Sequence, residues 1–522
     1  MGTVLLHGGT IVDGTGRASF PADLWIEGDR IASIGRCHAD PGLRIDCTGL
    51  TVAPGFIDAH SHSDLQVLEN RPEKVLQGVT TEVAGNCGFS AFPAGANRGA
   101  LPEFANGILH GGDGWGWDSA AAYLAVAKAA SNLIHVESLV GHGSLRVAFA
   151  GMRSGPLSAA ELGGMERVLD ESLASGACGF STGLMYAPGE SAPLAELEQL
   201  CRVVARHGKI YATHMRDYGC HLIEAVDEQI ALARRTGCRL QISHLQAVGE
   251  ANWTRQAPAL ERIERARDEG IDVSFDCYPY VAGSTVLTQW LPQRALEGGT
   301  EGLIHRLSDA SERSRIARET VDAMAHRWTD LFISAVASAA NQQLVGLSIQ
   351  AVAEARGCQP IDAVLDLLLE ECGAVNMLEF NQSLENLRQT VTHPLSNIIS
   401  DGFYVNGRPH PRLHGAFAEF LGGVCREKRW LELPEAVRKI TSRPAERFGL
   451  AGRGRVSEGC IADLVVFDPE TVGSPATYDR PEQPPRGIHY VLSAGRLTVR
   501  AGKIAKRGAT AAPGFRGWRS SP

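Results

Sequence analysis

The chain has 522 residues, of which 44% are hydrophobic and 21% charged, and it carries a formal net charge of −9. This length exceeds what one small core needs, so we expect a large domain and a smaller one. The acidic balance argues against a nucleic acid or a membrane surface as partner. Twelve cysteines without a Cys-x-x-Cys pair are not a disulfide framework, and they favour a reducing compartment.

The first residues, MGTVLLHGGTIVDG, lack the basic start of a signal peptide and reach glycine early. No apolar run in the sequence attains the roughly 18–20 residues of a membrane-spanning helix. We therefore expect a cytoplasmic protein.

Both ends of the chain show short strand patterns. Residues 1–52 contain TVLLHGGTIVD, ADLWIEG and RIASIG, and residues 451–507 contain CIADLVVFD and IHYVLSAGRLTVRAGKI. We expect these two ends to form one small β-sandwich domain. The tail, residues 508–522, is expected to be flexible.

Residues 53–450 alternate strand-like apolar runs with helical segments such as AELGGMERVLDESLAS. Alternation of this kind implies parallel strands, and eight runs favour an α/β fold with a (β/α)₈ TIM-like barrel. A helical excursion is expected at about 290–390, although residues 332–338 could instead be a strand. The eight runs are TVAPGFIDAH, VTTEVAGN, LIHVESLVG, ACGFSTG, KIYATH, RLQISH, IDVSFDCY and SNIISD.

Potential metal ligands stand where these runs end. In a barrel of this kind the carboxyl ends of the strands form the active site. Residues two apart on a strand point the same way, so both imidazoles of a His-x-His pair can face the barrel axis. Each residue alone has a structural explanation, but their coincidence at five strand ends indicates a metal site. The residues are His60, His62, Cys87, His214, His244 and Asp401.

Imidazole and thiolate ligands suit zinc. Zinc lowers the pKa of a bound water to about 7, and the carboxylate of Asp401 could take its proton and return it to a leaving amine. This chemistry predicts metal-assisted hydrolysis, most naturally of an amide, although a lactone or ring deamination fits too.

With these residues in place, the chain resembles the amidohydrolase superfamily and, within it, the N-acyl-D-amino-acid deacylases. The resemblance runs through APGFIDAHSHSD, GNCGFS, GHGSLR, STGLMYAPG, YATHMRD, ISHLQAVG, YPYVAGST, SDGFYVNGRPHPRLHG and TSRPAERFGL. Many relatives bridge two metals with a carboxylated lysine, and no lysine stands in the fourth run, CGFSTG.

The resemblance implies that Cys87, His214 and His244 hold one tight Zn²⁺. His60 and His62, with Cys87 and Asp401, would form a second and weaker metal position. Asp401 would be the general acid/base. Whether the Cys87 thiolate holds one metal or joins two stays open at this point.

The resemblance also implies how a small-molecule N-acyl amino acid is held. Its α-carboxylate would meet Tyr280, Ser284 and Arg412, of which a guanidinium can donate two parallel hydrogen bonds. Core packing is the alternative for Tyr280, and a surface salt bridge for Arg412. Tyr186 is expected to line the pocket or pack in the core.

One position departs from the family pattern. Gln246 stands where relatives often carry a lysine that binds carboxylate. Either Arg412 alone supplies the charge, or the substrate is not a simple N-acyl-D-amino acid. Arg294 could meet an acidic side chain but is expected to be solvated, and His142 is expected to be structural.

Three functions stay open. The first is a zinc deacylase for N-acyl-D-amino acids, and the second is a cyclic amidase or another amidohydrolase with the same site. The third is an inactive scaffold, which the complete ligand set disfavours. A homo-oligomer is compatible with all three.

Overall fold

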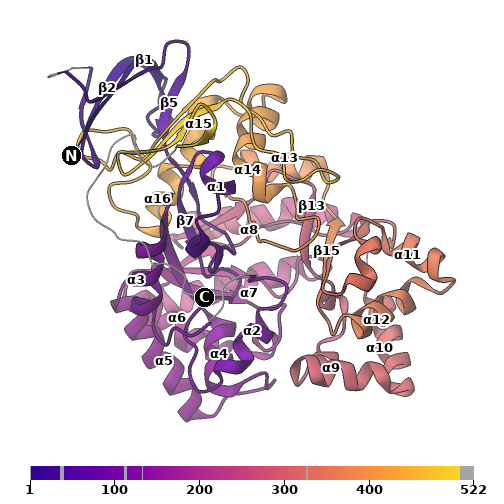
Figure 1. The fold of residues 1–522 in the computed structure, drawn as a ribbon. Helices are drawn as coiled ribbons and strands as arrows, with labels where there is room; N and C mark the ends of the chain where they lie inside the picture. Colours follow the sequence, from indigo (N-terminus) through magenta and orange to yellow (C-terminus); the bar gives the residue numbers. More distant parts are fainter. Residues whose placement is uncertain (1, 36–39, 111–114, 132, 325–326, 506–522) are drawn as a thin grey trace, which may run out of the picture.

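The computed structural model describes residues 2–35, 40–110, 115–131, 133–324 and 327–505. The chain forms a barrel, a β domain made from both ends of the chain, and an insertion that projects from the barrel on the other side (Figure 1). The flexible tail expected at residues 508–522 lies outside the described residues.

The barrel has eight parallel strands in the order β16-β12-β11-β10-β9-β8-β7-β6. Each of the eight predicted runs contains one of them, so the (β/α)₈ barrel is confirmed. The strands are β6 (Phe56–Asp58), β7 (Val79–Ala84), β8 (His135–Gly141), β9 (Gly179–Gly183), β10 (Ile210–His214), β11 (Arg239–Ile242), β12 (Val273–Cys277) and β16 (Ser396–Ile398).

The first and last strands of the barrel meet just beyond their carboxyl ends. The backbone N–H of Asp401 donates to the carbonyl of His60 at 2.9 Å, and the N–H of His62 donates to the carbonyl of Gly402 at 3.0 Å. These bonds place His60, His62 and Asp401 side by side, although more than 330 residues separate them in sequence.

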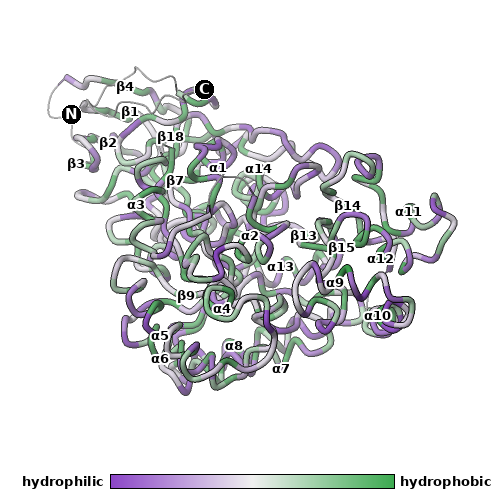
Figure 2. Tube along the Cα trace, turned by 60° about the horizontal axis from the view of Figure 1, so that its bottom comes forward, coloured by the Kyte–Doolittle hydropathy of each residue, from purple (hydrophilic) through white to green (hydrophobic). Residues whose placement is uncertain are grey.

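Amphipathic helices cover the outside of the barrel. Leu197, Leu200, Cys201 and Val204 of α6 are buried at helical spacing, while hydrophilic residues fill the other face, as the mixed colouring of α5 and α6 shows (Figure 2). The helices are α1 (Glu73–Leu76), α2 (Leu101–Phe104), α3 (Ala120–Ala130), α4 (His142–Ala150), α5 (Ala159–Ala174), α6 (Leu194–Arg206), α7 (Leu222–Thr236), α8 (Gln256–Asp268), α13 (Leu384–Thr392), α14 (Arg412–Glu419), α15 (Leu433–Lys439) and α16 (Ser442–Phe448).

The β domain combines both ends of the chain, as expected. Its strands form one hydrogen-bonded sheet, β20-β19-β18-β17-β5-β1-β2-β3, with β4 paired to β1, and the antiparallel pair β5–β17 joins the two ends. The strands are β1 (Thr3–Ile11), β2 (Phe20–Glu27), β3 (Arg30–Ile34), β4 (Leu43–Asp46), β5 (Thr51–Pro54), β17 (Leu464–Phe467), β18 (Ile488–Ser493), β19 (Arg496–Arg500) and β20 (Lys503–Ile504).

The insertion between β12 and β16 is not purely helical, which corrects the expected excursion at 290–390. It carries an antiparallel sheet, β13-β15-β14, made of β13 (Ala282–Val286), β14 (Leu331–Val336) and β15 (Val375–Phe380). Residues 332–338 thus do contribute a strand, but in a separate sheet, so the barrel keeps eight. The helices are α9 (Gly299–Ser308), α10 (Ala310–Ala323), α11 (Ile349–Arg356) and α12 (Pro360–Glu370).

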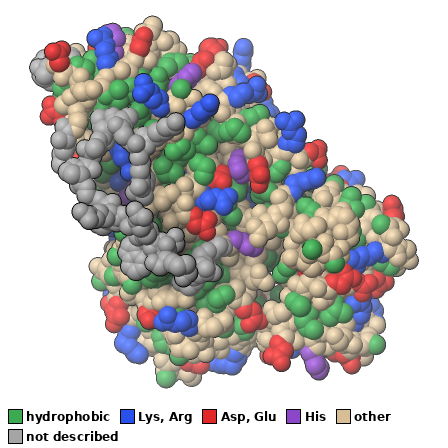
Figure 3. All heavy atoms as spheres, in the orientation of Figure 1, with side chains coloured by type: hydrophobic (Ala, Val, Ile, Leu, Met, Phe, Trp, Pro, Cys, Tyr) green, Lys and Arg blue, Asp and Glu red, His purple; other side chains and the backbone are tan. Residues whose placement is uncertain are grey.

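The distribution of charged side chains on the surface agrees with the acidic net charge of the sequence. On the face shown in Figure 3, acidic and basic side chains are interspersed and no extended basic area is visible. Within the described part of the chain, no helix has the length and apolarity to cross a membrane. The described cysteines are all free thiols.

Candidate metal centre

The six predicted ligands meet at the carboxyl end of the barrel. They come from the ends of five strands, namely β6, β7, β10, β11 and β16. All are at least nine-tenths buried, and three overlapping groups of them have ligand atoms within 4.8 Å of one another. The groups are His60, His62 and Cys87; Cys87, His214 and His244; and His60, His244 and Asp401.

One group comes close to the spacing of a tetrahedral zinc site. The Cys87 Sγ lies 3.5 Å from the His244 Nε2, and the His214 Nδ1 lies 3.0 Å from the same Nε2. Ligand atoms about 2.0–2.3 Å from a tetrahedral zinc stand ~3.3–3.8 Å apart. Cys87, His214 and His244 are therefore close to the arrangement that a zinc ion needs.

The other ligands surround a neighbouring position. The His60 Nε2 lies 3.2 Å from the Cys87 Sγ and 3.3 Å from the Asp401 Oδ1. The His62 Nε2 also lies 3.3 Å from the Asp401 Oδ1. Cys87 borders both positions, so its thiolate has the geometry to contact a metal in either one.

Two of the imidazoles are in the neutral form that metal binding needs. Burial lowers the pKa of His244 to about 4 and that of His214 well below its usual value, so both imidazoles are neutral at pH 7. Burial raises the pKa of the Cys87 thiol. A bound cation favours the thiolate, and neutral imidazole with thiolate is the donor set that suits zinc. The residues present therefore fit a zinc ion.

Asp401 is held as a carboxylate. Burial alone would raise its pKa, but the guanidinium of Arg412, 2.9 Å away, and the imidazole of His60 hold the pKa well below its usual value. Asp401 is thus ionised near neutral pH, which is the state that a general base requires.

Three of the six side chains stand on unusual backbone. Cys87, His244 and Asp401 have φ angles of 52°, 33° and 50°, in the left-handed region that residues other than glycine seldom adopt. Such conformations cluster at functional sites because the surrounding structure must enforce them. Here they turn each side chain inward directly after its strand ends.

Glycines make room for the Cys87 turn. The last residue of β9, Gly183, packs on the carbonyl of Cys87 so closely that a Cβ would not fit. Gly141 at the end of β8 also lies too close to the carbonyl of Gly88 for a Cβ to fit. The fourth strand end therefore has backbone contact with the Cys87 turn and no lysine.

Asp276 supports two of the ligands and was missed in the sequence. Its Oδ1 accepts the backbone N–H of His244 at 2.6 Å and lies 3.5 Å from the His60 Nδ1. Such carboxylates orient ligating imidazoles. An acid inside the apolar run IDVSFDCY was the available signal.

A buried lysine supports Asp401 from behind. Lys74 of α1 contacts the carboxylate of Asp58 and donates to the Ser400 Oγ at 2.5 Å, and it lies 3.5 Å from Glu82. The same Ser400 hydroxyl accepts the N–H of Gly402 at 2.9 Å. Ser400 and Gly402, the two residues that flank Asp401, are thereby held in place. The sequence analysis also missed Lys74, because a lysine in a short helical segment is usually exposed to solvent.

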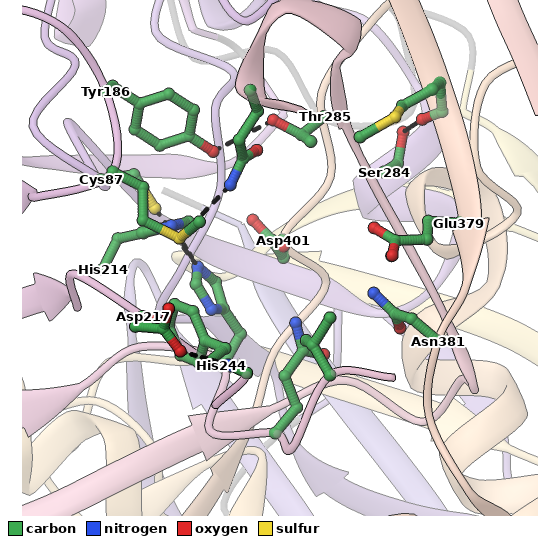
Figure 4. Close-up of a pocket in the computed structure, with 18 of the residues that line it drawn as sticks. Cys87, Tyr186, His214, Asp217, His244, Ser284, Thr285, Glu379, Asn381 and Asp401 are labelled. Atoms are coloured by element: carbon green, nitrogen blue, oxygen red, sulfur yellow. Dashed lines mark hydrogen bonds between the residues drawn. The ribbon is translucent and has the colours of Figure 1, made fainter. Parts of the chain in front are cut away.

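A cavity of about 190 Å³ opens onto these ligands. In Figure 4, Cys87, His214, His244 and Tyr186 lie on one side of it, and Ser284, Glu379 and Asn381 lie on the other, with Asp401 between. Four of the predicted substrate residues line it, namely Tyr186, Gln246, Ser284 and Arg412.

Tyr280 does not line this cavity, which corrects its predicted role. Its ring packs 5.1 Å from His410 and 6.4 Å from Tyr478, centroid to centroid. The N–H of Tyr280 donates to the carbonyl of Tyr278 at 2.9 Å, which closes a tight turn. Because of this turn, Tyr278 and Tyr280 do not point the same way, as residues two apart on a strand would. Tyr278 lines the cavity instead, with its hydroxyl 2.9 Å from the Gln246 Oε1.

Two other side chains are engaged elsewhere. Arg294 pairs with Glu312 at 2.5 Å and with Glu319 at 2.9 Å, and it does not line the cavity. His142 is buried and its Nε2 lies 2.8 Å from Glu196, which also binds Arg146. The bonds given for these two residues involve none of the six candidate ligands.

Known proteins share the sequence and the fold. The amidohydrolase family profile matches residues 44–505. An N-acyl-D-glutamate deacylase of Alcaligenes xylosoxydans xylosoxydans is 37% identical over 98% of this chain and 97% of its own. The crystal structure of N-acyl-D-glutamate deacylase from Bordetella bronchiseptica, with zinc and a phosphonate mimic of the tetrahedral intermediate, has a TM-score of 0.82 at 34% identity and covers 96% of this chain and 98% of its own.

A D-aminoacylase structure, studied for its binuclear metal centre, has a TM-score of 0.83 at 34% identity and covers 97% of this chain and 98% of its own. The chain belongs to the amidohydrolase family, in the branch of the N-acyl-D-amino-acid deacylases. It is accordingly a hydrolase of carbon–nitrogen bonds other than peptide bonds.

Proposed function

We propose that this enzyme removes the acyl group from N-acyl-D-amino acids in a zinc-dependent reaction. The observation that carries the proposal is the convergence of Cys87, His214 and His244 beside an ionised Asp401 in one cavity. The relatives described above, which act on N-acyl-D-glutamate or are D-aminoacylases, support an amide of a D-amino acid as substrate.

The tight zinc is assigned to Cys87, His214 and His244, and a weaker second position to His60, His62, Cys87 and Asp401. When bound, zinc would polarise the scissile carbonyl and lower the pKa of an attacking water. A relative with a binuclear centre supports two positions. The sharing of Cys87 between the two groups is the geometric support in this chain.

Asp401 is the proposed general acid/base. Its carboxylate faces the cavity, is ionised because of Arg412, and is held by the backbone bond to His60. It would take the proton from water during attack and deliver it to the leaving amine, which restores the carboxylate.

The α-carboxylate of the substrate is assigned to the side of the cavity that carries Arg412. The guanidinium lies 4.6 Å over the Tyr278 ring, and both residues line the cavity. The oxygen of Gln246 accepts the Tyr278 hydroxyl, so the NH₂ of Gln246 is the end that would donate to a carboxylate. The Ser284 hydroxyl donates to the Met377 carbonyl at 3.0 Å, so Ser284 lines the cavity but its proton is already used.

A hydrolysis screen tests the proposal. Zinc-loaded protein is offered matched N-acetyl-D- and N-acetyl-L-amino acids together with hydantoins and dihydrouracil. We expect release of acetate from the D series and little from the L series. Turnover of the cyclic amides alone would replace the deacylase assignment with a cyclic amidase.

A further inference from the structure

A second cavity, of about 100 Å³, lies between the barrel mouth and the insertion. From the barrel it is lined by Phe104, at the end of α2, and by Met152, just after α4. From the insertion it is lined by Leu296 and by Leu303 of α9. None of these residues has a role in the site described above.

The second cavity adjoins the metal-site cavity, and five residues line both: Phe89, Ile108, Met185, Tyr186 and Gln289. The rings form an unbroken apolar wall. The Tyr186 centroid lies 4.8 Å from that of His214 and 5.0 Å from that of Phe89, and Phe89 stacks on Phe104 at 4.6 Å. The wall thus leads from a metal ligand into the second cavity.

Two of the polar groups at the second cavity make local hydrogen bonds. The carboxylate of Glu103 accepts the backbone N–H of Thr300 at 2.6 Å, at the first turn of α9. The amide of Gln289 donates to the Met185 sulfur at 3.4 Å. The side chains of Phe104, Met152, Leu296 and Leu303 offer a ligand hydrocarbon and aromatic surface beside these polar groups.

The position of this apolar wall indicates which part of a substrate would lie against it. In the proposed reaction the α-carboxylate and α-carbon lie on the Arg412 side, and the scissile carbonyl lies at the metal ligands. Arg412 donates to the Ser284 carbonyl at 3.3 Å, and Figure 4 shows Ser284 across the cavity from Tyr186 and Cys87. The acyl substituent would then extend from the carbonyl toward Tyr186 and Cys87.

We propose that this second cavity, lined by Phe104, Met152, Leu296 and Leu303, binds the hydrocarbon chain of the acyl group. The enzyme is then a deacylase for amino acids that carry medium-length or aromatic acyl groups rather than acetyl alone. This inference rests on the proposed deacylase function and specifies its acyl specificity. Burial of additional CH₂ groups against the apolar wall supplies the preference.

The test is a chain-length series measured on the zinc-loaded full-length enzyme. The substrates are N-acetyl-, N-butanoyl-, N-hexanoyl- and N-octanoyl-D-methionine, with kcat/KM as the readout. We expect kcat/KM to rise by about tenfold or more from acetyl to octanoyl. In Met152→Trp, where an indole fills the cavity, the octanoyl value should fall about tenfold while the acetyl value stays within about twofold.

Leu296→Trp gives the same test from the opposite wall if Met152→Trp does not fold. Val126→Trp, on the exposed outer face of α3, is the matched control and should leave both values unchanged. Acetyl hydrolysis without a gain for octanoyl would overturn the acyl-chain assignment alone. No hydrolysis of any member would overturn the deacylase function as well.

If the substrate binds the other way round, with its amino-acid side chain in the second cavity, the kinetics differ. If filling the cavity penalises N-acetyl-D-2-aminooctanoate relative to N-acetyl-D-alanine, while acyl length has no effect, the cavity holds the amino-acid side chain. That result would overturn the proposal.

Discussion

Arg412 and Asp401 form a buried ion pair, with the Arg412 Nη1 2.9 Å from the Asp401 Oδ2. The two residues were predicted separately, one for the substrate carboxylate and one for proton transfer. Their contact links the two roles, because the same guanidinium that would attract the substrate also keeps Asp401 ionised. A substrate carboxylate would have to share Arg412 with Asp401.

Arg412→Ala should therefore impair both substrate binding and turnover. We expect KM for an N-acyl-D-amino acid to rise about a hundredfold, which corresponds to ~3 kcal/mol of lost binding. kcat should fall too, because Asp401 loses its counter-charge. Steady-state kinetics with measured zinc content checks this.

Gln246→Ala is the comparison for Arg412→Ala. It removes an uncharged donor from the same side of the cavity, so KM should rise only about tenfold and kcat should change little. Equal effects of the two variants would show that charge does not dominate carboxylate binding.

Cys87→Ala should abolish hydrolysis and lower bound zinc, because Cys87 borders both metal positions. Asp401→Ala should also abolish hydrolysis but keep the tight zinc, since Asp401 is not in the Cys87, His214 and His244 group. Atomic emission on the purified variants measures the metal.

Cys178→Ala is the control for the thiol. Cys178 is buried just before β9 and outside the ligand groups, so this variant should keep both zinc and activity. Full zinc occupancy in Cys87→Ala would refute the ligand assignment.

Lys74→Met should destabilise the protein by ~3–5 kcal/mol, because it leaves the carboxylate of Asp58 buried without its cation. kcat should fall while zinc is retained, since the contact to Ser400 that positions Asp401 is lost. Thermal unfolding and metal content measure the two effects.

The double variant Lys74→Met with Asp58→Asn separates charge from packing. Removing both charges should restore part of the lost thermal stability, which an additive pair would not do. Additive losses would mean that the pair does not act as a unit.

Glu196 should make stability depend on pH. Burial acts to raise its pKa, but His142 and Arg146 hold it below its usual 4.5. A carboxyl whose pKa is lower in the folded state stabilises the fold above its unfolded pKa. That contribution is lost as the pH falls below about 4.5 and through the folded value.

Glu196→Gln should accordingly lower the Tm at pH 7 and reduce its decline on acidification. The loss at pH 7 should be ~3–5 kcal/mol, because Arg146 stays buried without its partner. Thermal scans from pH 7 down to about pH 2, which cross the unfolded and folded pKa values, check this. Parallel Tm curves for the two proteins would contradict the assignment.

Much of the site was predictable, because strand ends in a parallel barrel all face one way. His60, His62, Cys87, His214, His244 and Asp401 each follow an apolar run, and the barrel brings such positions together whatever their separation in the chain. The repeated strand and helix pattern therefore sufficed to predict the fold and the meeting of these six side chains at one end of the barrel.

Contacts outside that regular pattern were not predictable. Tyr278 and Tyr280 both follow β12, and only the turn between them decides which one enters the cavity. Strands β14 and β15 are short apolar runs between helices, and such runs do not differ in period from buried helix segments. Asp276 and Lys74 gain their roles from neighbours far away in sequence.

The sequence by itself determined the barrel, the two-ended β domain and which side chains are candidate zinc ligands, because hydrophobic periodicity and residue chemistry are local properties. Only the tertiary structure decided the pairing of Arg412 with Asp401, the left-handed turns at Cys87, His244 and Asp401, and the apolar cavity beside them. These features depend on distances between segments that are far apart in the sequence. The packing of the barrel against the insertion determines those distances.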